Sequence, residues 1–172
     1  VKANADDENI SKSMEKVKKN FAGSEIKGKK LGVIGLGAIG VLVANAANRL
    51  GMDVYGVDPF LSVKNALTLS RDITVCKSYD ELYKTCDYIT VHVPYMPETK
   101  GLLNKEAFDQ MKDGVVVLNF ARDLLVNDDD MKAALESGKV AKYVTDFPNS
   151  AVVKMPNVIA TPHLGASTEE SE

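Results

Sequence analysis

One of the chain's two histidines stands in a segment that suits proton transfer. His163 follows Thr-Pro and precedes Leu-Gly-Ala-Ser-Thr, and the spacing of Ser167 and Glu170 is typical of a capping box that opens a helix. A histidine held between the end of a strand and the start of a helix is well placed to act as a general acid–base group. The alternative interpretation is a histidine in a surface loop.

Arg122 is a second candidate for chemistry, because it follows directly after the apolar segment Val-Val-Val-Leu-Asn-Phe-Ala. Its planar guanidinium can hold a substrate carboxylate through two parallel hydrogen bonds. The alternative is a surface ion pair with Asp123. The other histidine, His92, lies within Tyr-Ile-Thr-Val-His-Val-Pro, and we interpret it as a packed residue inside a strand.

The segment Gly-Leu-Gly-Ala-Ile-Gly at residues 35–40 has the spacing of a dinucleotide-binding turn and lies between an apolar run and a helical pattern. Gly35 permits a sharp turn, Gly37 lets the backbone approach a pyrophosphate, and Gly40 lets helix and strand pack closely. The N–H groups near Ala38 and Ile39, at the expected start of the helix, suit phosphate oxygens.

Asp58 closes the next β-rich run, Asp-Val-Tyr-Gly-Val-Asp. A carboxylate at this point can accept both ribose hydroxyls of NAD and would repel the 2′-phosphate of NADP. NAD is therefore the predicted cofactor. The alternative is a tight turn in an α/β domain that binds nothing, with Asp58 solvated at the end of its strand.

The elements that must position these residues alternate along the chain. We predict strands at 31–35, 53–58, 73–76, 88–93, 115–120, 141–146 and 157–160, and helices at 8–20, 38–50, 78–85, 104–111 and 127–137. This alternation favours an α/β fold of Rossmann type, a doubly wound and mostly parallel sheet with helices on both faces. Ligands of such sheets bind beyond the carboxyl ends of the strands. The polar residues and their neighbours expected there are His92, Val93, Pro94, Asn119, Phe120, Ala121, Arg122, Asp146, Thr161, Pro162, His163, Leu164 and Gly165.

Composition excludes several classes of protein. The chain has 172 residues, about one domain by length, with 45% hydrophobic residues and a net charge of −3, so no basic surface favours nucleic acid. Its longest apolar stretch holds four glycines and is too short to span a membrane. Cys76 and Cys86 lack the spacing of a redox or zinc motif. We expect buried or half-buried thiols in a reducing, cytoplasmic compartment and no metal site.

Five segments together resemble the D-isomer-specific 2-hydroxyacid dehydrogenases. They are GKKLGVIGLGAIG, VYGVDP, CDYITVHVP…TKGLLN, MKDGVVVLNFAR and NVIATPHLGAST, in the family's order, and they extend from about residue 25 to the end of the chain. Within that family the motifs are most similar to those of members that oxidise 3-phosphoglycerate in serine biosynthesis.

The resemblance implies a role for each polar residue. Arg122 would bind the carboxylate and carbonyl of a 2-keto acid, and His163 would exchange a proton with the keto oxygen. Asp146 would hold the nicotinamide carboxamide, and Asp58 the adenosine ribose. The cofactor site implied in this way comprises Gly35, Gly37, Ala38, Ile39, Gly40, Asp58, Val93, Pro94, Phe120, Ala121, Arg122, Asp146, His163, Gly165 and Ala166.

Two residues depart from the family's pattern. The family pairs its histidine with a glutamate that follows the position of Asp146, but the shortened segment DFPNSAVVKMPNVIATPH holds no acid other than Asp146. A carboxylate partner would favour the protonated imidazole and fix its orientation. Our hypothesis is that Asp146 serves in this role as well. The family also usually has glycine where this chain has Asp123, an acid beside the substrate-binding cation.

The resemblance further implies a division of the chain. Residues 1–24 would be a linker helix from a substrate domain, residues 25–166 the NAD-binding domain, and residues 167–172 the start of a helix that leads back to the substrate domain. We expect the chain alone to bind NAD(H) with little turnover, because one wall of the cleft belongs to the other domain. The family usually dimerises through this domain, so a homodimer or higher homo-oligomer is expected.

Three functions stay open at this point. The first is a dehydrogenase for 3-phosphoglycerate, and the second is a dehydrogenase for glycerate, lactate or another small 2-hydroxy acid. The third is a non-catalytic NAD-sensing module, which the missing glutamate favours. The presence of both Arg122 and His163 favours an enzyme with a small 2-hydroxy or 2-keto acid as its partner.

Overall fold

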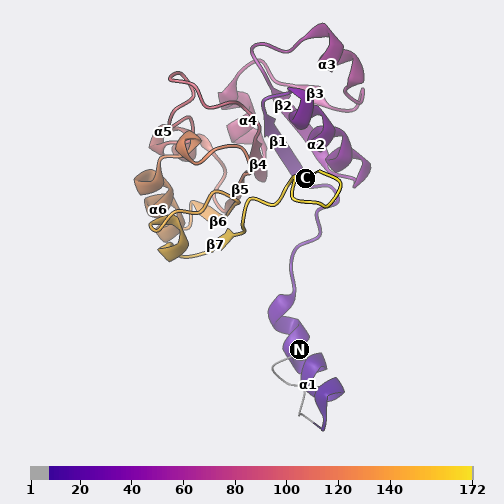
Figure 1. The fold of residues 1–172 in the computed structure, drawn as a ribbon, viewed down its shortest axis with the longest axis vertical. Helices are drawn as coiled ribbons and strands as arrows, with labels where there is room; N and C mark the ends of the chain where they lie inside the picture. The colour runs from indigo at the N-terminus through magenta and orange to yellow at the C-terminus, as the bar shows by residue number, and fades with distance from the viewer. Residues whose placement is uncertain (1–7, 172) are drawn as a thin grey trace.

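The computed structural model describes residues 8–171, which form one seven-stranded sheet (Figure 1). The strand order is β3-β2-β1-β4-β5-β6-β7, and every strand pair is parallel. The strands are β1 (Lys30–Ile34), β2 (Asp53–Val57), β3 (Thr74–Val75), β4 (Tyr88–Val91), β5 (Val115–Asn119), β6 (Val140–Thr145) and β7 (Val158–Ala160). The order reverses between β1 and β4, so the carboxyl ends of these two strands open the crevice in which such folds bind ligands.

Helices connect the strands and begin at polar caps. The α-helices are α1 (Ile10–Val17), α2 (Ala38–Arg49), α3 (Val63–Thr68), α4 (Tyr79–Thr85), α5 (Lys105–Gln110) and α6 (Asp128–Glu136). Short 3₁₀ helices lie at Lys18–Phe21, Asp123–Leu125 and Val152–Lys154. The side chains of Ser62, Ser78, Asn104 and Asn127 each accept the N–H three residues on, which satisfies a donor that the first turn leaves free.

Two hydrophobic cores lie on opposite faces of the sheet. On β1, Leu31 and Val33 belong to the core under α2, whereas Ile34 belongs to the larger core under α4, α5 and α6. Gly32 faces α4, because a Cβ there would come within 2.5 Å of Leu82. The two-residue alternation of a strand thus divides consecutive side chains between two helix layers, as a doubly wound sheet requires.

The predicted fold class is confirmed, but one half of one sheet face carries no helix among the described residues. On β5 and β6 the residues that alternate with the core, Val116, Leu118 and Val144, are only half-buried, and Lys142 is exposed. On β7, Ile159 is 47% exposed. Helix α2, which covers this side of the sheet, packs on β1 and β2, and α3 contacts α2 (Figure 1).

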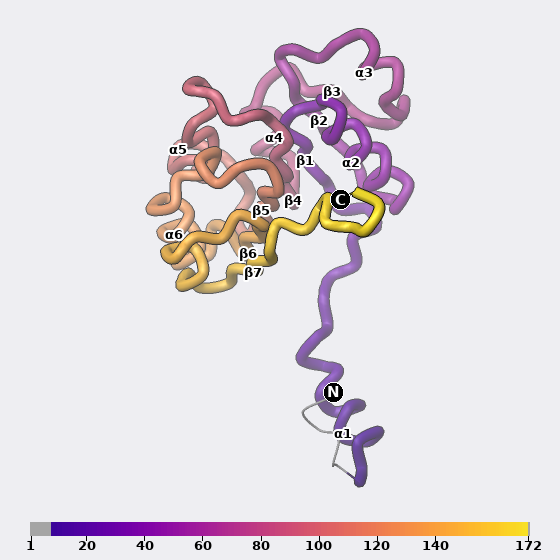
Figure 2. Tube along the Cα trace, in the orientation of Figure 1, coloured from indigo at the N-terminus to yellow at the C-terminus, as the bar shows by residue number. Residues whose placement is uncertain are grey.

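The N-terminal helix stands away from the sheet (Figure 2). The predicted helix at 8–20 is present as α1 followed by the 3₁₀ turn at Lys18–Phe21, and neither element has a buried residue. Residues 1–7 of the expected linker lie outside the described residues. No helix within residues 8–171 is long and apolar enough to cross a membrane.

Three expectations about secondary structure are wrong. Helix α3 was not predicted, because it is only six residues long, too short for a helical repeat to extend beyond one turn, and none of it is buried. His92 lies just after β4, which ends at Val91. Residues 164–171 form two turns, closed by the N–H groups of Ser167 and Ser171, where a helix was expected. A first helical turn fixes several dihedral angles for one hydrogen bond, and these exposed residues have no packing to offset that cost.

Candidate functional site

The glycine-rich turn between β1 and α2 depends on two close backbone approaches. Gly35 has a φ of 91°, and a Cβ there would come within 2.8 Å of the carbonyl oxygen of His92. A Cβ on Gly40 would lie 1.8 Å from the carbonyl oxygen of Gly35. Gly37 differs, because a Cβ there would meet nothing within 4 Å. Two glycines therefore shape the turn, and the third keeps open space at the first turn of α2.

Asp58 fixes the same turn from the end of β2. Its Oδ2 accepts the backbone N–H of Leu36 at 2.9 Å, and its Oδ1 accepts that of Phe60 at 2.8 Å. Each carboxylate oxygen can accept a further hydrogen bond, so this arrangement leaves acceptors for a diol. A cavity of about 220 Å³ lies beside it, lined by Gly35, Gly37, Asp58, Pro59, Phe60, Tyr79, His92, Val93, Pro94, Met96 and Thr99.

A larger cavity of about 550 Å³ lies at the carboxyl ends of the central strands. Its lining comprises Ile39, His92, Val93, Pro94, Tyr95, Phe120, Ala121, Arg122 and His163. His92, Val93 and Pro94 line both cavities, so the segment after β4 separates them. Burial lowers the pKa of His92, which keeps its ring neutral at pH 7. Its Nε2 lies 2.9 Å from the hydroxyl of Thr90.

Asp146 and His163 form a hydrogen-bonded pair beside the larger cavity. Oδ2 of Asp146 lies 2.8 Å from Nδ1 of His163. The aspartate side chain is only 10% exposed, whereas the imidazole is 55% exposed. The buried partner thus holds one ring nitrogen and leaves the opposite edge of the ring on the accessible side. Oδ1 of Asp146 is buried and accepts no hydrogen bond from the described residues.

Arg122 is held by contacts other than an ion pair with Asp123, which was the alternative interpretation. Its Nη1 donates to the carbonyl of Ala121 at 2.7 Å, and its guanidinium carbon lies 5.4 Å from the ring centre of Phe147. The carboxylate of Asp123 instead accepts the N–H of Leu124 at 2.9 Å. The acid that replaces the family's usual glycine therefore starts a 3₁₀ helix and does not neutralise the arginine.

Asn119, at the end of β5, fixes the conformation of the loop at residues 120–122, which carries Arg122. Its Nδ2 donates to the carbonyl of Arg122 at 2.7 Å and to the hydroxyl of Tyr143 at 3.4 Å. Its Oδ1 accepts the N–H of Ala121 at 3.1 Å. The side chain is fully buried, so its own polar atoms depend on these partners for their hydrogen bonds.

We expect Asn119→Ala to destabilise the protein by about 1–3 kcal/mol, because it removes the hydrogen bonds that this buried carboxamide makes to the carbonyl of Arg122 and the N–H of Ala121. Urea unfolding followed by circular dichroism measures this change. The matched control is Gln110→Ala, which removes a carboxamide that donates to its own helix at the surface. Equal stability losses in the two variants would contradict the role given to Asn119.

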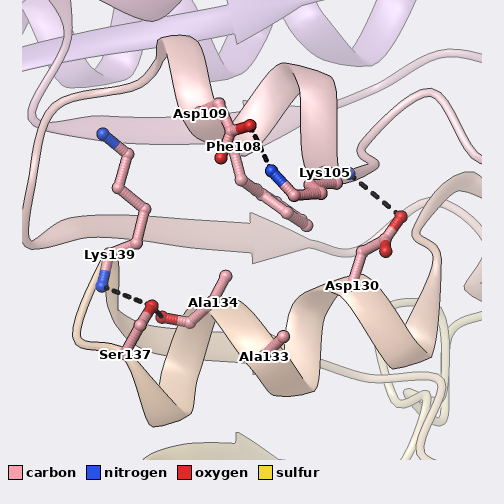
Figure 3. A pocket seen from close by; sticks show the side chains of 8 residues that line it. All are labelled: Lys105, Phe108, Asp109, Asp130, Ala133, Ala134, Ser137 and Lys139. Atoms are coloured by element: carbon pink, nitrogen blue, oxygen red, sulfur yellow. Dashed lines mark hydrogen bonds and ion pairs between the residues drawn. The ribbon is translucent and has the colours of Figure 1, made fainter.

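A third cavity, of about 290 Å³, lies between α5 and α6, apart from the strand ends (Figure 3). Each of its charged side chains already has a partner. The ammonium of Lys105 pairs with Asp109, Asp130 accepts the N–H of Lys105, and Lys139 pairs with Asp113. We assign it no ligand. The described residues also contain no group of three or more His, Cys, Asp or Glu arranged to hold a metal ion.

Comparison with known protein families identifies the family of the chain that forms this crevice. Residues 2–165 match the family model described as D-isomer specific 2-hydroxyacid dehydrogenase, NAD binding domain. The chain belongs to this family. The 2-hydroxyacid dehydrogenase match covers the glycine turn, both cavities and the Asp146–His163 pair.

Individual relatives agree with the assignment to the 2-hydroxyacid dehydrogenases. D-3-phosphoglycerate dehydrogenase of Bacillus subtilis is 42% identical over 171 residues, which cover 95% of this chain and 32% of that protein. The enzyme of the same name from Archaeoglobus fulgidus is 40% identical over 162 residues, which cover 90% of this chain and 30% of that protein. The chain thus spans less than a third of the length of these relatives.

Solved structures match the fold of the chain. The apo form of Rhodotorula graminis D-mandelate dehydrogenase superposes with a TM-score of 0.80 at 27% identity, covering 95% of this chain and 49% of that one. The NAD complex of a D-isomer specific 2-hydroxyacid dehydrogenase from Lactobacillus delbrueckii ssp. bulgaricus gives 0.77 at 26% identity, covering 89% and 51%. Both matches extend over most of the chain and about half of the other protein.

The residues of this 2-hydroxyacid dehydrogenase domain fit NAD. The open position at Gly37 leaves room for a pyrophosphate at the start of α2, and Asp58 keeps acceptor capacity for ribose hydroxyls. The unpaired, buried Oδ1 of Asp146 would be satisfied by a carboxamide N–H. Three polar parts of the cofactor thus each have a matching residue: the pyrophosphate at Gly37, the ribose hydroxyls at Asp58 and the carboxamide at Asp146.

Most of the predicted site residues line the two cavities, but five do not. Asp146 is one of them, since it is buried and hydrogen-bonded to His163, which lines the larger cavity. Ala38 and Gly40 lie in the first turn of α2 and contribute backbone, whereas Gly165 and Ala166 are exposed beyond His163 and line neither cavity. Sequence reasoning missed Tyr79 and Phe60 as lining residues and Phe147 as a neighbour of both catalytic candidates. The tertiary packing of the chain places these side chains at the site. They belong to no sequence motif, so motif spacing could not predict them.

Proposed function

We propose that this chain is the cofactor-binding half of an enzyme that transfers hydride between NAD and a D-2-hydroxy acid. The observation that carries the proposal is the group formed by Arg122, His163 and Asp146 at one cavity. It combines a cation for a carboxylate, an accessible imidazole and a buried carboxylate that orients the imidazole. A module that only senses NAD has no need for this combination.

In the proposed reaction each side chain has one task. NAD, when bound, supplies hydride transfer at C4 of its nicotinamide ring. The guanidinium of Arg122 holds the carboxylate of the 2-keto acid, which directs the keto carbon toward the cofactor. The imidazole of His163 donates a proton to the keto oxygen in reduction and removes it in oxidation. Asp146 holds the ring through Nδ1, so the other ring nitrogen faces the substrate.

We propose 3-phosphoglycerate as the substrate, with 3-phosphohydroxypyruvate as the product, in serine biosynthesis. Support comes from the relatives, since those cited above at 40% and 42% identity carry the name D-3-phosphoglycerate dehydrogenase. The test follows NADH oxidation by the full-length protein with 3-phosphohydroxypyruvate, hydroxypyruvate, pyruvate and glyoxylate. Preference for an unphosphorylated acid would contradict the proposed substrate. Tight NADH binding without turnover of any keto acid would contradict the proposal of an enzyme and favour an NAD sensor.

The double role proposed for Asp146 has its own test. We expect Asp146→Asn in the full-length protein to lower kcat by about 10- to 100-fold, because a charge-assisted hydrogen bond of about 1.5–3 kcal/mol is lost. The pH–rate profile should change as well, since Nδ1 of His163 then faces a neutral amide in place of a carboxylate. The matched control is Asp113→Asn, an acid paired with Lys139 at the surface. A pH–rate profile that coincides with that of the wild type would exclude this role.

We also propose that the full-length protein is a homodimer or a higher homo-oligomer. The N-terminal segment supports this, because Ile10, Met14 and Val17 recur on one side of α1 and Phe21, in the 3₁₀ helix that follows, is 81% exposed. Multi-angle light scattering of the full-length protein measures the mass directly. A monomeric mass at micromolar concentration would contradict the proposal.

A cytoplasmic location is the last part of the proposal. Cys76 and Cys86 are both buried free thiols, and burial raises their pKa to about 11 and about 12. Such thiols stay protonated and unreactive at neutral pH, which suits a compartment that keeps cysteine reduced. Cell fractionation followed by immunodetection tests this location.

A further inference from the structure

The ring of Phe147 lies against both side chains to which the proposed function assigns substrate chemistry. Its centroid is 4.5 Å from that of the His163 imidazole, with the two planes tilted by 42°. The guanidinium carbon of Arg122 lies 5.4 Å from the same centroid. One aromatic side chain thus joins two residues that are 41 positions apart in the sequence and come from different strand ends.

The backbone holds Phe147 firmly at this point. The N–H of Phe147 donates to the hydroxyl of Thr145 at 3.1 Å, and Thr145 is fully buried at the end of β6. The preceding residue, Asp146, is also buried and carries the hydrogen bond to His163. Pro148 follows and restricts the backbone of Phe147 to extended conformations. The ring is therefore set by the same short segment that orients the imidazole.

The two neighbours of the ring need such support. The imidazole of His163 is 55% exposed and has one hydrogen bond, through Nδ1, which fixes the position of that nitrogen but leaves the ring plane free to rotate about it. Arg122 has many rotamers and hydrogen-bonds to the carbonyl of Ala121 in its own loop. An aromatic face attracts a guanidinium through its quadrupole, and it contacts an imidazole favourably in tilted geometry.

We propose that Phe147 is a positioning residue that holds the imidazole of His163 and the guanidinium of Arg122 at a fixed separation for a 2-keto acid. This inference rests on the proposed function. The carboxylate and the keto oxygen of such a substrate are attached to adjacent carbons, so the two side chains must be placed relative to each other. Phe147 contacts both side chains and thereby fixes the position of one relative to the other.

The experiment compares Phe147→Leu with Phe147→Tyr in the full-length protein, using the 2-keto acid that gives the highest turnover. Leucine keeps an apolar side chain without an aromatic face, and tyrosine keeps the ring. For Phe147→Leu we expect kcat/KM to fall about five- to fifty-fold, divided between a higher KM for the keto acid and a lower kcat. For Phe147→Tyr we expect both parameters within about twofold of the wild type, since the ring contacts remain.

Two further readouts separate this role from simple packing. The affinity for NADH should be unchanged in both variants, because Phe147 lines neither cavity. The imidazole resonances of His163, assigned with a His163→Gln sample, should carry a ring-current shift that the leucine variant loses and the tyrosine variant keeps. An unchanged KM and kcat in Phe147→Leu, or a loss confined to melting temperature and NADH affinity, would overturn the proposal.

The failure of the proposed function stays distinguishable from the failure of this inference. If the wild-type protein reduces none of the keto acids, the proposed function fails, and the resonance shifts alone then decide whether Phe147 positions His163. If the wild type is active and the resonances of His163 are the same in Phe147→Leu, the positioning role fails while the proposed function stands.

Discussion

Replacing His163 with glutamine should lower kcat of the full-length protein by about 10²- to 10⁴-fold, the usual contribution of a general acid–base group. Glutamine keeps a hydrogen-bonding group near Asp146 but cannot transfer a proton at neutral pH. Binding of NADH should change little, because the resting cofactor does not need this proton. Stopped-flow measurement of NADH oxidation under single-turnover conditions reports the chemical step directly.

The control for this prediction is Glu169→Gln, an exposed polar residue of the same C-terminal segment. That variant should retain turnover within about twofold, as surface substitutions usually do. A His163→Gln protein that keeps more than a tenth of the wild-type kcat would show that another group supplies the proton. The remaining histidine, His92, is neutral and bonded to Thr90, so it would be the next residue to examine.

Gly40→Ala should destabilise the protein by about 3 kcal/mol, at the upper end of the range for overpacking. The added methyl would lie 1.8 Å from the carbonyl oxygen of Gly35, and neither group is on a flexible side chain. The turn must therefore move, and with it the N–H groups that suit phosphate. We expect the affinity for NADH to fall at least about tenfold, equivalent to 1.4 kcal/mol. Urea unfolding and fluorescence titration with NADH measure the two effects.

Gly37→Ala provides the contrast. Its Cβ would meet nothing within 4 Å of protein, and the backbone of Gly37 is extended with φ at −73°. Stability should therefore change by less than about 0.5 kcal/mol. The affinity for NADH should still fall, because the methyl would occupy the space left for the pyrophosphate. Equal loss of stability in the two variants would contradict the different roles assigned to these glycines.

The larger part of the fold could be predicted from periodicity and turn residues. The strands from β1 to β7 and the helices α2, α4, α5 and α6 each begin and end within about two residues of the predicted ranges. Helix α3 could not be predicted, because its residues Val63 and Leu67 are exposed and follow no burial pattern. The end of β4 was placed too late, since Val-His-Val-Pro continues the apolar run although the pairing with β5 stops at Val91.

Only part of the site, too, could be predicted from the sequence. Motif spacing and the carboxyl-end rule were enough to predict several of the side chains that line the larger cavity, including Arg122 and His163, but not Phe60 or Tyr79 in the smaller one. They could not predict the distances among those side chains. The hydrogen bonds of Asn119 to its own loop and the aromatic contacts of Phe147 depend on backbone turns that no residue pattern encodes. The proximity of Asp146 to His163 was a hypothesis from the missing glutamate, and the 2.8 Å separation is consistent with it.

The unpaired carboxylate oxygen of Asp146 has a consequence for attempts to engineer this domain. Among the described residues this oxygen has no donor, and a buried acceptor left without one costs about 1–3 kcal/mol until a ligand supplies it, a large share of the stability of a small domain. A selection for heat resistance alone should therefore enrich apolar residues at position 146 and yield proteins that are more thermostable but inactive. A selection that couples heating to NADH oxidation should keep the aspartate and gain its stability from positions away from the crevice.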